Sequence, residues 1–278
     1  AISTTSELVK ISSDGNLGLQ EGQKFERGGI YRFTVDVTKG NTKAVLTVEK
    51  VGKVDLPAPD IFFGNSKMEV TDTDIYKSDQ AFTQGQMITV TGIDNLNEWW
   101  IDPDFFEKQS DGTLKFLPIN GDYRVTANAV LKYFSVMALK DGKPAKLQDD
   151  GTGAIWAIGK GIGKPSVTSS EVGWEPGKAL CLAQVAPKKY QLTLKAGETL
   201  KTSGDWEAIS FKFFYQNDWG GEFGNYASSI LVEQLKLADS GNLEMQDNKA
   251  FEEGAVYRFT IDVTNGNANA DLKVEKIN

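Results

Sequence analysis

The stretch that decides the fold is Gly254-Ala-Val-Tyr-Arg-Phe-Thr-Ile-Asp-Val-Thr264. Apolar residues occupy every second position of it: Tyr257, Phe259, Ile261 and Val263. A period of two is typical of a β-strand with one buried face. The Asn265-Gly266 pair that follows favours the positive φ angles of a tight turn, and a second alternating strand comes after it. The stretch therefore predicts an antiparallel β-hairpin.

The same stretch occurs near the start of the chain, at residues 29–38, and the match extends without a gap in both directions. Gly15 matches Gly241 and Lys50 matches Lys276, both at a separation of 226 residues. A weaker third version begins at Gly121. A gap-free repeat of this length indicates duplication of a structural module.

The repeats divide the chain into three parts. Residues 150–278 form the complete copy, with short strand-like segments between turn residues, and predict an antiparallel sandwich. Residues 1–52 contain the second half of that module, so we expect either that its first strands are missing here or that it pairs with the middle region. Residues 53–149 predict a diverged middle sandwich.

The predicted fold class is therefore all-β, with tandem antiparallel β-sandwich domains of immunoglobulin-like or carbohydrate-binding-module-like type. In the last module, Ala154 to Ile158 predicts a buried strand, and the glycine-rich residues 159–163 predict a loop after it. Leu56-Pro57-Ala58-Pro59 is typical of a linker.

Composition excludes several functions. The 278 residues carry a net charge of -8, which argues against nucleic acid or an anionic membrane as partner. Histidine is absent, which removes Ser-His-Asp and Cys-His catalysis and the usual zinc sites. The single cysteine, Cys181, cannot form an intramolecular disulfide. No apolar run has the length of a transmembrane segment.

The richest candidate site is the segment 213–226, which leaves a strand and enters a glycine-rich loop. It combines aromatic, amide and acidic residues: Trp219, Phe223, Tyr226, Gln216, Asn217, Asn225, Asp218 and Glu222. Sugars need this mixture, because a pyranose face packs on a flat aromatic ring while amides and carboxylates replace water at the hydroxyls. The alternative is that Trp219 folds back and caps the sandwich.

Other tryptophans are weaker candidates. Trp174 lies in a Gly/Pro loop and is the second candidate, with packing at the sheet edge as the alternative. Trp206 is a third, whereas Trp156 lies within an apolar strand and is expected in the core. Trp99 and Trp100 are adjacent and so face opposite ways on a strand. We expect one in the core, and the other free for a ligand or against a neighbouring module.

Paired acids are a further candidate for catalytic groups. Asp102 with Asp104, or Asp218 with Glu222, could serve a glycosidase if each pair flanked a cleft. Nothing in the spacing fixes them in that way, and acids in turns are usually solvated. We therefore expect no catalytic residues, no metal site and no cofactor.

The order of these segments resembles the repeated sandwich module of SusE/SusF-type surface glycan-binding lipoproteins of Bacteroidetes starch-utilisation-like systems. The resemblance rests on Trp156 to Gly163, Gly173-Trp174, residues 190–197, Phe211-Lys212-Phe213 and residues 254–263. It implies non-catalytic binding of oligo- or polysaccharide at the outer-membrane surface to assist an importer. Carried over by position, it favours as glycan-binding residues Trp174, Trp219, Lys212, Gln216, Asn217 and Glu222.

The predicted function is thus binding of a starch-like glucan or another glycan by a monomeric, surface-exposed lipoprotein. Its anchor is not in this chain, and importer components are candidate partners. A spacer protein of an outer-membrane complex, without a glycan site, is the alternative. A glycoside hydrolase is disfavoured, because no catalytic domain fits the length. Exposure of Trp174, Trp219 or Tyr226 in a coplanar arrangement would favour glycan binding, and burial of all three would favour the spacer.

Overall fold

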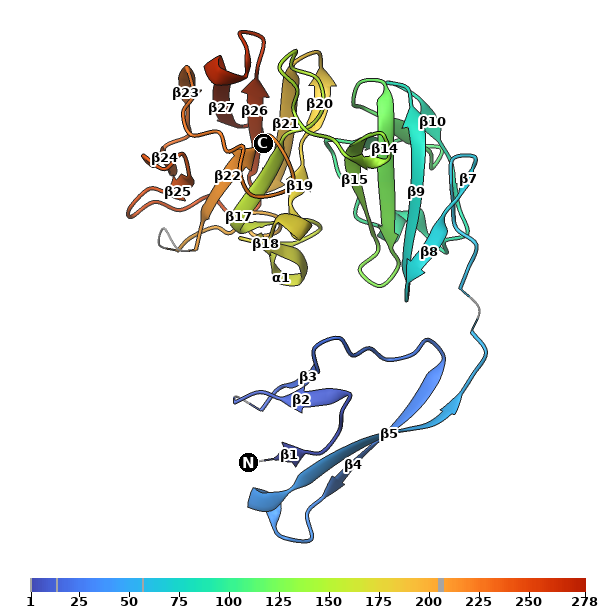
Figure 1. Ribbon diagram of the computed structural model, residues 1–278. Helices are drawn as coiled ribbons and strands as arrows, with labels where there is room; N and C mark the ends of the chain where they lie inside the picture. Colours follow the sequence, from blue (N-terminus) through green and yellow to red (C-terminus); the bar gives the residue numbers. More distant parts are fainter. Residues whose placement is uncertain (1, 14, 57, 205–207) are drawn as a thin grey trace. The chain divides into compact units, whose positions relative to one another are not determined.

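The computed structural model describes residues 2–13, 15–56, 58–204 and 208–278, and Trp206 lies outside them. The described chain consists of β-strands with a few short helical turns (Figure 1). It divides into two compact units, Ala1–Pro59 and Asp60–Asn278. The prediction of an all-β chain with tandem antiparallel sandwiches is confirmed.

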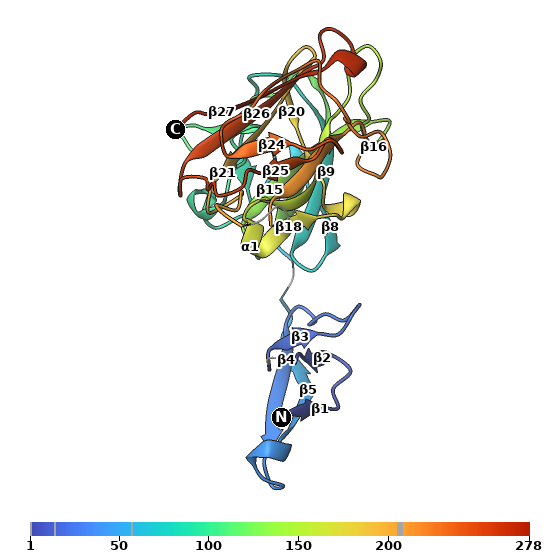
Figure 2. The same cartoon turned by 90° about the vertical axis from the view of Figure 1, so that its left-hand side faces the viewer.

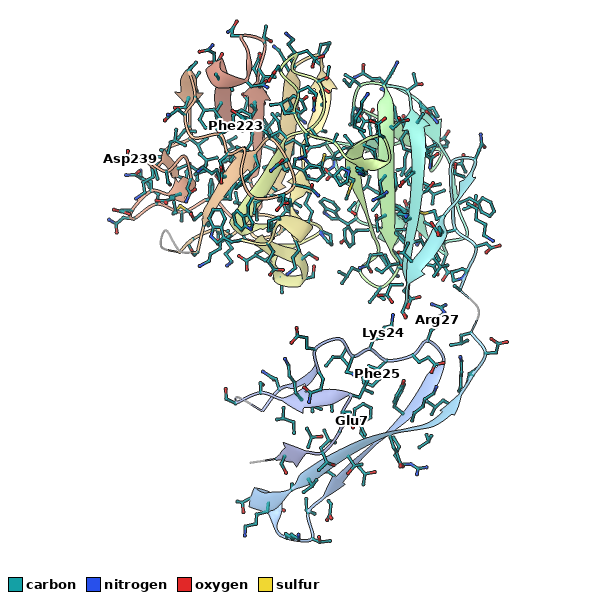
Figure 3. The ribbon with its side chains drawn as sticks, in the orientation of Figure 1. Glu7, Lys24, Phe25, Arg27, Phe223 and Asp239 are labelled. Atoms are coloured by element: carbon teal, nitrogen blue, oxygen red, sulfur yellow. The ribbon has the colours of Figure 1, made fainter. Side chains whose placement is uncertain are left out.

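The unit Ala1–Pro59 contains the predicted hairpin. Strands β4 (Gly29–Asp36) and β5 (Val45–Lys53) pair in antiparallel orientation, and β1 (Ser3–Thr4) joins the other edge of β5 in parallel. Strands β2 (Val9–Ile11) and β3 (Leu17–Leu19) form a second hairpin. Phe25, labelled in Figure 3, packs its ring against Tyr31 at 4.8 Å between centroids.

The end of the chain repeats this arrangement strand for strand. The repeated strands are β23 (Ser228–Ile230), β24 (Leu235–Leu237), β25 (Leu243–Met245), β26 (Val256–Asp262) and β27 (Asp271–Lys276). The pairings are the same, because β23 is parallel to β27 while β24–β25 and β26–β27 are antiparallel. The 3-10 turns η1 (Asn41–Lys43) and η4 (Asn267–Asn269) also correspond. The sequence repeat is therefore a repeat of structure.

The two copies differ in what covers them. In the last module β25 also pairs with β22 (Ser210–Phe214), and β26 with β21 (Lys189–Lys195). Among the described residues of the first unit, β3 and β4 have no such additional neighbour. Phe33 is consequently 50% exposed, whereas its counterpart Phe259 is 0% exposed. The first unit is thus an uncovered half-sandwich.

The middle sandwich packs one five-stranded sheet against two three-stranded sheets. The larger sheet has the order β16-β15-β14-β9-β8, and the smaller sheets are β10-β13-β12 and β11-β6-β7. Their bounds are β6 (Phe62–Phe63), β7 (Ser66–Lys67), β8 (Glu69–Asp72), β9 (Ile75–Phe82), β10 (Met87–Ile88), β11 (Val90–Thr91), η2 (Leu96–Glu98), β12 (Phe106–Lys108), β13 (Leu114–Phe116), β14 (Gly121–Asn128), β15 (Tyr133–Lys140) and β16 (Lys143–Pro144). Phe63 joins the sheets through ring contacts with Phe82, Phe106 and Phe134.

The C-terminal sandwich has two sheets. One has the order β18-β17-β22-β25-β24, with β19 on β17, and the other has the order β20-β21-β26-β27-β23 (Figure 1). Figure 2 shows β20, β21, β26 and β27 of the second sheet in a view turned by 90°. The remaining bounds are β17 (Trp156–Gly163), α1 (Val167–Ser170), β18 (Glu171–Gly173), η3 (Pro176–Lys178), β19 (Leu180–Cys181) and β20 (Ala183–Ala186). Phe211 and Phe213 of one sheet meet Phe259 of the other at 5.5 and 6.4 Å, which closes the core.

The glycine-rich segment 159–163 is not the loop that its composition predicted. It continues strand β17, which pairs with β22 and β18. A Cβ at Gly159 would lie 2.3 Å from the Phe211 Cα, so glycine here permits close approach of the neighbouring strand. Glycine can therefore mark a close strand contact as well as a turn.

Candidate functional site

The candidate site lies on the outer face of the sheet that contains β22. Alternate residues of β22 face opposite sides, so Phe211 and Phe213 enter the core while Lys212 and Phe214 face outward. Phe214 lies opposite Trp156 of β17, and both side chains are buried. This outer face is therefore covered by other parts of the chain and is apolar at its centre.

The loop after β22 brings Trp219 over this face. The loop closes as Tyr215 N donates to Gly221 O at 2.7 Å and Phe223 N donates to Phe213 O at 3.0 Å. Gly220 and Gly221 have φ values of 80° and 71°, which glycine adopts without strain. The Trp219 ring meets Phe214 edge-on at 6.0 Å and remains 51% exposed.

Trp174 joins Trp219 from a different part of the sheet. It follows β18 and precedes η3, and the positive φ of Gly173 turns the chain just before it. The two indoles are stacked, with centroids 6.3 Å apart and planes inclined by 26°. We call Trp174 and Trp219 the tryptophan pair. Trp174 is half-buried, so the pair presents a partly exposed aromatic surface.

The predicted polar residues lie around the same loop in different environments. Gln216 is half-buried and its Nε2 donates to Trp219 O at 2.7 Å, which fixes the loop. Asn217 is half-buried and Glu222, bridged to Phe214, is exposed. Lys212 is half-buried beside Gly241. The structure thus ties the Gln216 side chain to the backbone of Trp219.

Tyr226 makes its ring contact within its own loop. Its ring stacks on buried Phe223, labelled in Figure 3, at 5.8 Å and 3°. Among the described residues its hydroxyl is buried without a hydrogen-bond partner. Burial raises the pKa of this hydroxyl. Tyr226 is therefore placed to support the loop, and its hydroxyl is not presented to solvent.

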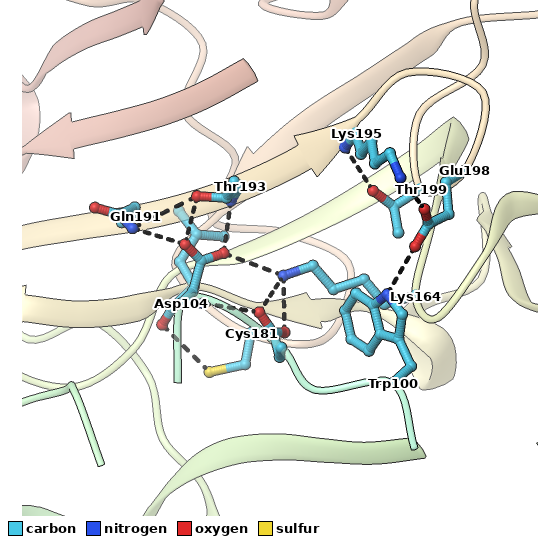
Figure 4. A network of polar contacts seen from close by, with 11 residues as sticks. Trp100, Asp104, Lys164, Cys181, Gln191, Thr193, Lys195, Glu198 and Thr199 are labelled. Atoms are coloured by element: carbon cyan, nitrogen blue, oxygen red, sulfur yellow. Dashed lines mark hydrogen bonds and ion pairs between the residues drawn. The ribbon is translucent and has the colours of Figure 1, made fainter. Parts of the chain in front are cut away.

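A second polar cluster joins the two sandwiches of the unit Asp60–Asn278, and Figure 4 shows its contacts. Lys164 of the C-terminal sandwich donates to both Asp102 oxygens at 2.8 and 2.7 Å and to Asp104 Oδ2 at 3.1 Å. All three side chains are buried. The expectation that acids in this turn are solvated is therefore wrong, because the turn is covered by the neighbouring sandwich.

The two carboxylates have different environments. Burial disfavours ionisation of Asp104, but Lys164, Thr193 and Gln191 outweigh it and hold the pKa of Asp104 below its usual range. Its donors are Thr193 N and Oγ1, both at 2.6 Å, and Gln191 Nε2 at 2.7 Å. Burial raises the pKa of Asp102, which has fewer donors. The ion pairs raise the pKa of Lys164 despite its burial.

The adjacent tryptophans also meet at this junction. Trp99 is buried and stacks on Phe134 at 4.6 Å. Trp100 points the other way, and its Nε1 donates to Glu198 Oε1 of the C-terminal sandwich at 2.8 Å. The predicted division into one core residue and one residue resting on a neighbouring module is what the structure shows. Trp156 is buried as predicted, with Nε1 donating to Ala145 O at 3.0 Å.

The structure has two further general properties. Within the described residues, no helix combines the length and apolarity needed to cross a bilayer. The same residues contain no group of three or more Cys, Asp or Glu side chains arranged to hold a metal ion.

Fold and site together define an all-β protein of sandwich modules with a paired-tryptophan surface on the last one. The chain belongs to the family described as domain of unknown function DUF5121, which matches residues 1–38 and 150–264, more than half of the chain. A second family, domain of unknown function DUF5125, matches residues 56–147. No curated protein matches the sequence.

A solved structure similar to this chain is that of SusF from Bacteroides thetaiotaomicron. The two share 15% identity with a TM-score of 0.30, over 97% of this chain and 65% of that chain. This chain therefore spans less than two thirds of the SusF length.

Proposed function

We propose that this chain binds an oligo- or polysaccharide, a starch-like glucan or another glycan, without cleaving it. The observation that carries the proposal is the tryptophan pair, in which Trp219 is 51% exposed and stacked with Trp174 at 6.3 Å. Exposing an indole to water is unfavourable, and the free face of an exposed aromatic ring packs well on the apolar face of a sugar unit. The polar side chains of Gln216, Asn217 and Glu222 lie in the same loop.

The cellular setting belongs to the same proposal. By its sequence resemblance to SusE/SusF-type proteins, we place the chain on the outer surface of an outer membrane as a lipoprotein module. There it would hold glycan near an importer. We also propose that residues 1–52, 53–149 and 150–278 are the three building blocks of the chain, with the glycan site in the third.

The test is affinity electrophoresis against a panel of soluble glucans, mannans, xylans and galactans. Wild-type protein should be retarded by at least one polysaccharide, and Trp174→Ala and Trp219→Ala should each weaken binding about tenfold or more, because each removes a stacking surface. Phe25→Ala, which removes a 37% exposed aromatic ring from the first unit, is the matched control and should leave retardation unchanged. Wild-type retardation in both tryptophan variants would refute the site.

A spacer or interaction protein is the second candidate function. It is favoured by the uncovered apolar residues of the first unit, Phe33, Val35 and Val37, which are 50%, 51% and 51% exposed. No retardation on any polysaccharide would favour this function. Time-dependent release of reducing ends from a polysaccharide would instead contradict the non-catalytic part of the proposal.

A further inference from the structure

A pocket of about 680 Å³ lies between the two sandwiches of the unit Asp60–Asn278. One wall is the outer face of β15, the strand that lies beside β19 of the C-terminal sandwich (Figure 1). Tyr133, Ser135 and Met137 line this wall and are half-buried, while Phe134 and Val136 between them are buried in the middle core. The pocket is thus a gap between the two sandwiches, and strand β15 forms its floor.

The opposite wall comes from short elements of the C-terminal sandwich. Helix α1, the segment between β18 and η3, and Leu180 of β19 contribute to it. Trp100 lines one end, and its ring is held in place by the bond to Glu198. The buried contact of Lys164 with Asp102 fixes the two walls relative to each other. The pocket is therefore built by the packing of the two sandwiches.

Every charged side chain that lines the pocket is already paired. Glu175 pairs with Lys178 at 2.9 Å, and the buried Asp102 pairs with Lys164. Glu171 accepts from Lys201 at 2.9 Å and from Gly161 N at 2.8 Å, and these partners help hold its pKa low despite burial. A charged ligand would have to displace one of these partners, so the pocket favours an uncharged one.

The remaining lining is a mixture of hydroxyl, amide and apolar groups. Hydroxyls come from Tyr133, Ser135 and Ser170, an amide from Asn128, and an apolar surface from Leu180. The volume lies within the range of about 300–1,000 Å³ that holds small organic ligands. We propose that the pocket is a second subsite for an uncharged sugar, an inference that rests on the proposed glycan-binding function.

The pocket and the tryptophan pair share one segment of chain. Gly173 and Glu175 line the pocket, and Trp174 between them stacks on Trp219. The two places are therefore joined through one short segment of chain. The subsite accordingly adds affinity for longer chains, which occupy both places, more than for short ones.

The pocket can be filled without touching the tryptophan pair. Ser135→Trp places an indole in it, and Met137→Trp is a second variant at the same wall. Lys77→Trp is the matched control, because Thr126 pairs with both Ser135 and Lys77 and all three lie on one face of one sheet. Binding is measured by calorimetry with the retarding polysaccharide and with its oligosaccharides of increasing length. Amide exchange over residues 130–139 is followed with and without sugar.

Both filled variants should lose about tenfold in affinity for the long chains and much less for the shortest, while Lys77→Trp binds as wild type. Sugar should slow exchange over residues 130–139 in the wild type. If both filled variants bind with wild-type affinity and sugar leaves amide exchange unchanged, the subsite is refuted. The tryptophan pair remains the proposed site in that case if Trp219→Ala has lost binding. If the filled variants lose affinity while Trp219→Ala does not, the subsite is supported and the tryptophan pair is refuted as the glycan site. No binding to any polysaccharide refutes both.

Discussion

Lys164 and Asp102 lie 62 residues apart in sequence and form a buried, two-pronged ion pair across the junction of two sandwiches. Lys164 Nζ lies 2.8 and 2.7 Å from the two Asp102 carboxylate oxygens and 3.1 Å from Asp104 Oδ2, which completes the cluster. One ammonium is shared by two carboxylates, so the second negative charge depends on hydrogen bonds from Thr193 and Gln191. The junction is therefore sensitive to loss of any one member.

Removing the ammonium should be costly. Lys164→Met leaves two buried carboxylates without a cation, and we expect a loss of about 3–5 kcal/mol in the free energy of unfolding. Urea denaturation followed by tryptophan fluorescence measures it. Lys195→Met, which removes an exposed partner of Glu198, is the control and should cost less than about 1 kcal/mol. Equal losses in the two variants would contradict a special role for the junction.

Replacing the whole cluster should restore stability. The triple variant Lys164→Met, Asp102→Asn, Asp104→Asn carries no buried charge, and we expect it to recover most of the loss of Lys164→Met. The comparison uses the same urea titration. A triple variant as unstable as the single one would mean that the substituted side chains and the hydrogen bonds lost at Asp104, and not the unpaired charges, disrupt the junction.

The cluster also predicts a pH dependence. The folded pKa of Asp104 lies below its unfolded value, so Asp104 contributes stability above about pH 4 that is lost as pH falls through the folded pKa. The pKa of Asp102 is higher in the folded chain than in the unfolded chain. As pH falls, folded Asp102 is therefore protonated first, and this protonation does not lower the stability. The stability difference between wild type and Asp104→Asn should therefore be largest near pH 7 and shrink below pH 4. Parallel curves in urea titrations at pH 7, 5 and 3 would contradict this.

Tyr226 offers a test that separates support from binding. Its buried hydroxyl lacks a partner among the described residues, so Tyr226→Phe should be neutral or stabilising by about 1 kcal/mol. Thermal unfolding measures the change, and affinity electrophoresis should show unchanged retardation. Weaker glycan binding in Tyr226→Phe would instead return the hydroxyl to the binding surface, as the sequence suggested.

The two copies of the repeat should respond differently to the same substitution. Phe259→Ser removes a ring that is 0% exposed, and we expect a loss of about 3–5 kcal/mol. Phe33→Ser removes a ring that is 50% exposed, so it should cost much less and should lower binding of a hydrophobic dye such as ANS. Calorimetric unfolding and dye titration give both values. Equal destabilisation would mean that Phe33 is covered in solution.

The alternation of apolar and polar residues was enough to predict the strands. The hairpin at residues 254–264, its copy at 29–38 and the all-β class followed from a period of two that local geometry imposes. The burial of Trp156 followed from its apolar neighbours, and one of Trp99 and Trp100 was expected in the core because adjacent residues on a strand face opposite ways. These features depend on residues close together in the chain, which is why one sequence suffices for them.

Other features depend on segments that meet only in the folded chain. The stacking of Trp174 on Trp219 joins positions 45 residues apart, and both were singled out because of their loops rather than their proximity. The burial of Asp102 and Asp104 depends on a lysine from another sandwich. Gly159 belongs to a strand because Phe211 approaches it closely. Spacing along the chain carries no signal for such contacts.

The matched spacing of β1–β5 and β23–β27 has a consequence for how the last module can be taken apart. The segment before β23 is a surface connection, since Gly224, Asn225 and Ala227 are exposed, and the strands after it complete both sheets of the sandwich, with β25 on β22 and β26 on β21. A polypeptide of residues 60–226 and one of residues 227–278 are therefore natural complements. Their reassembly, driven by the faces of Phe211 and Phe259, would turn this module into a split reporter whose halves are already defined by its own duplication.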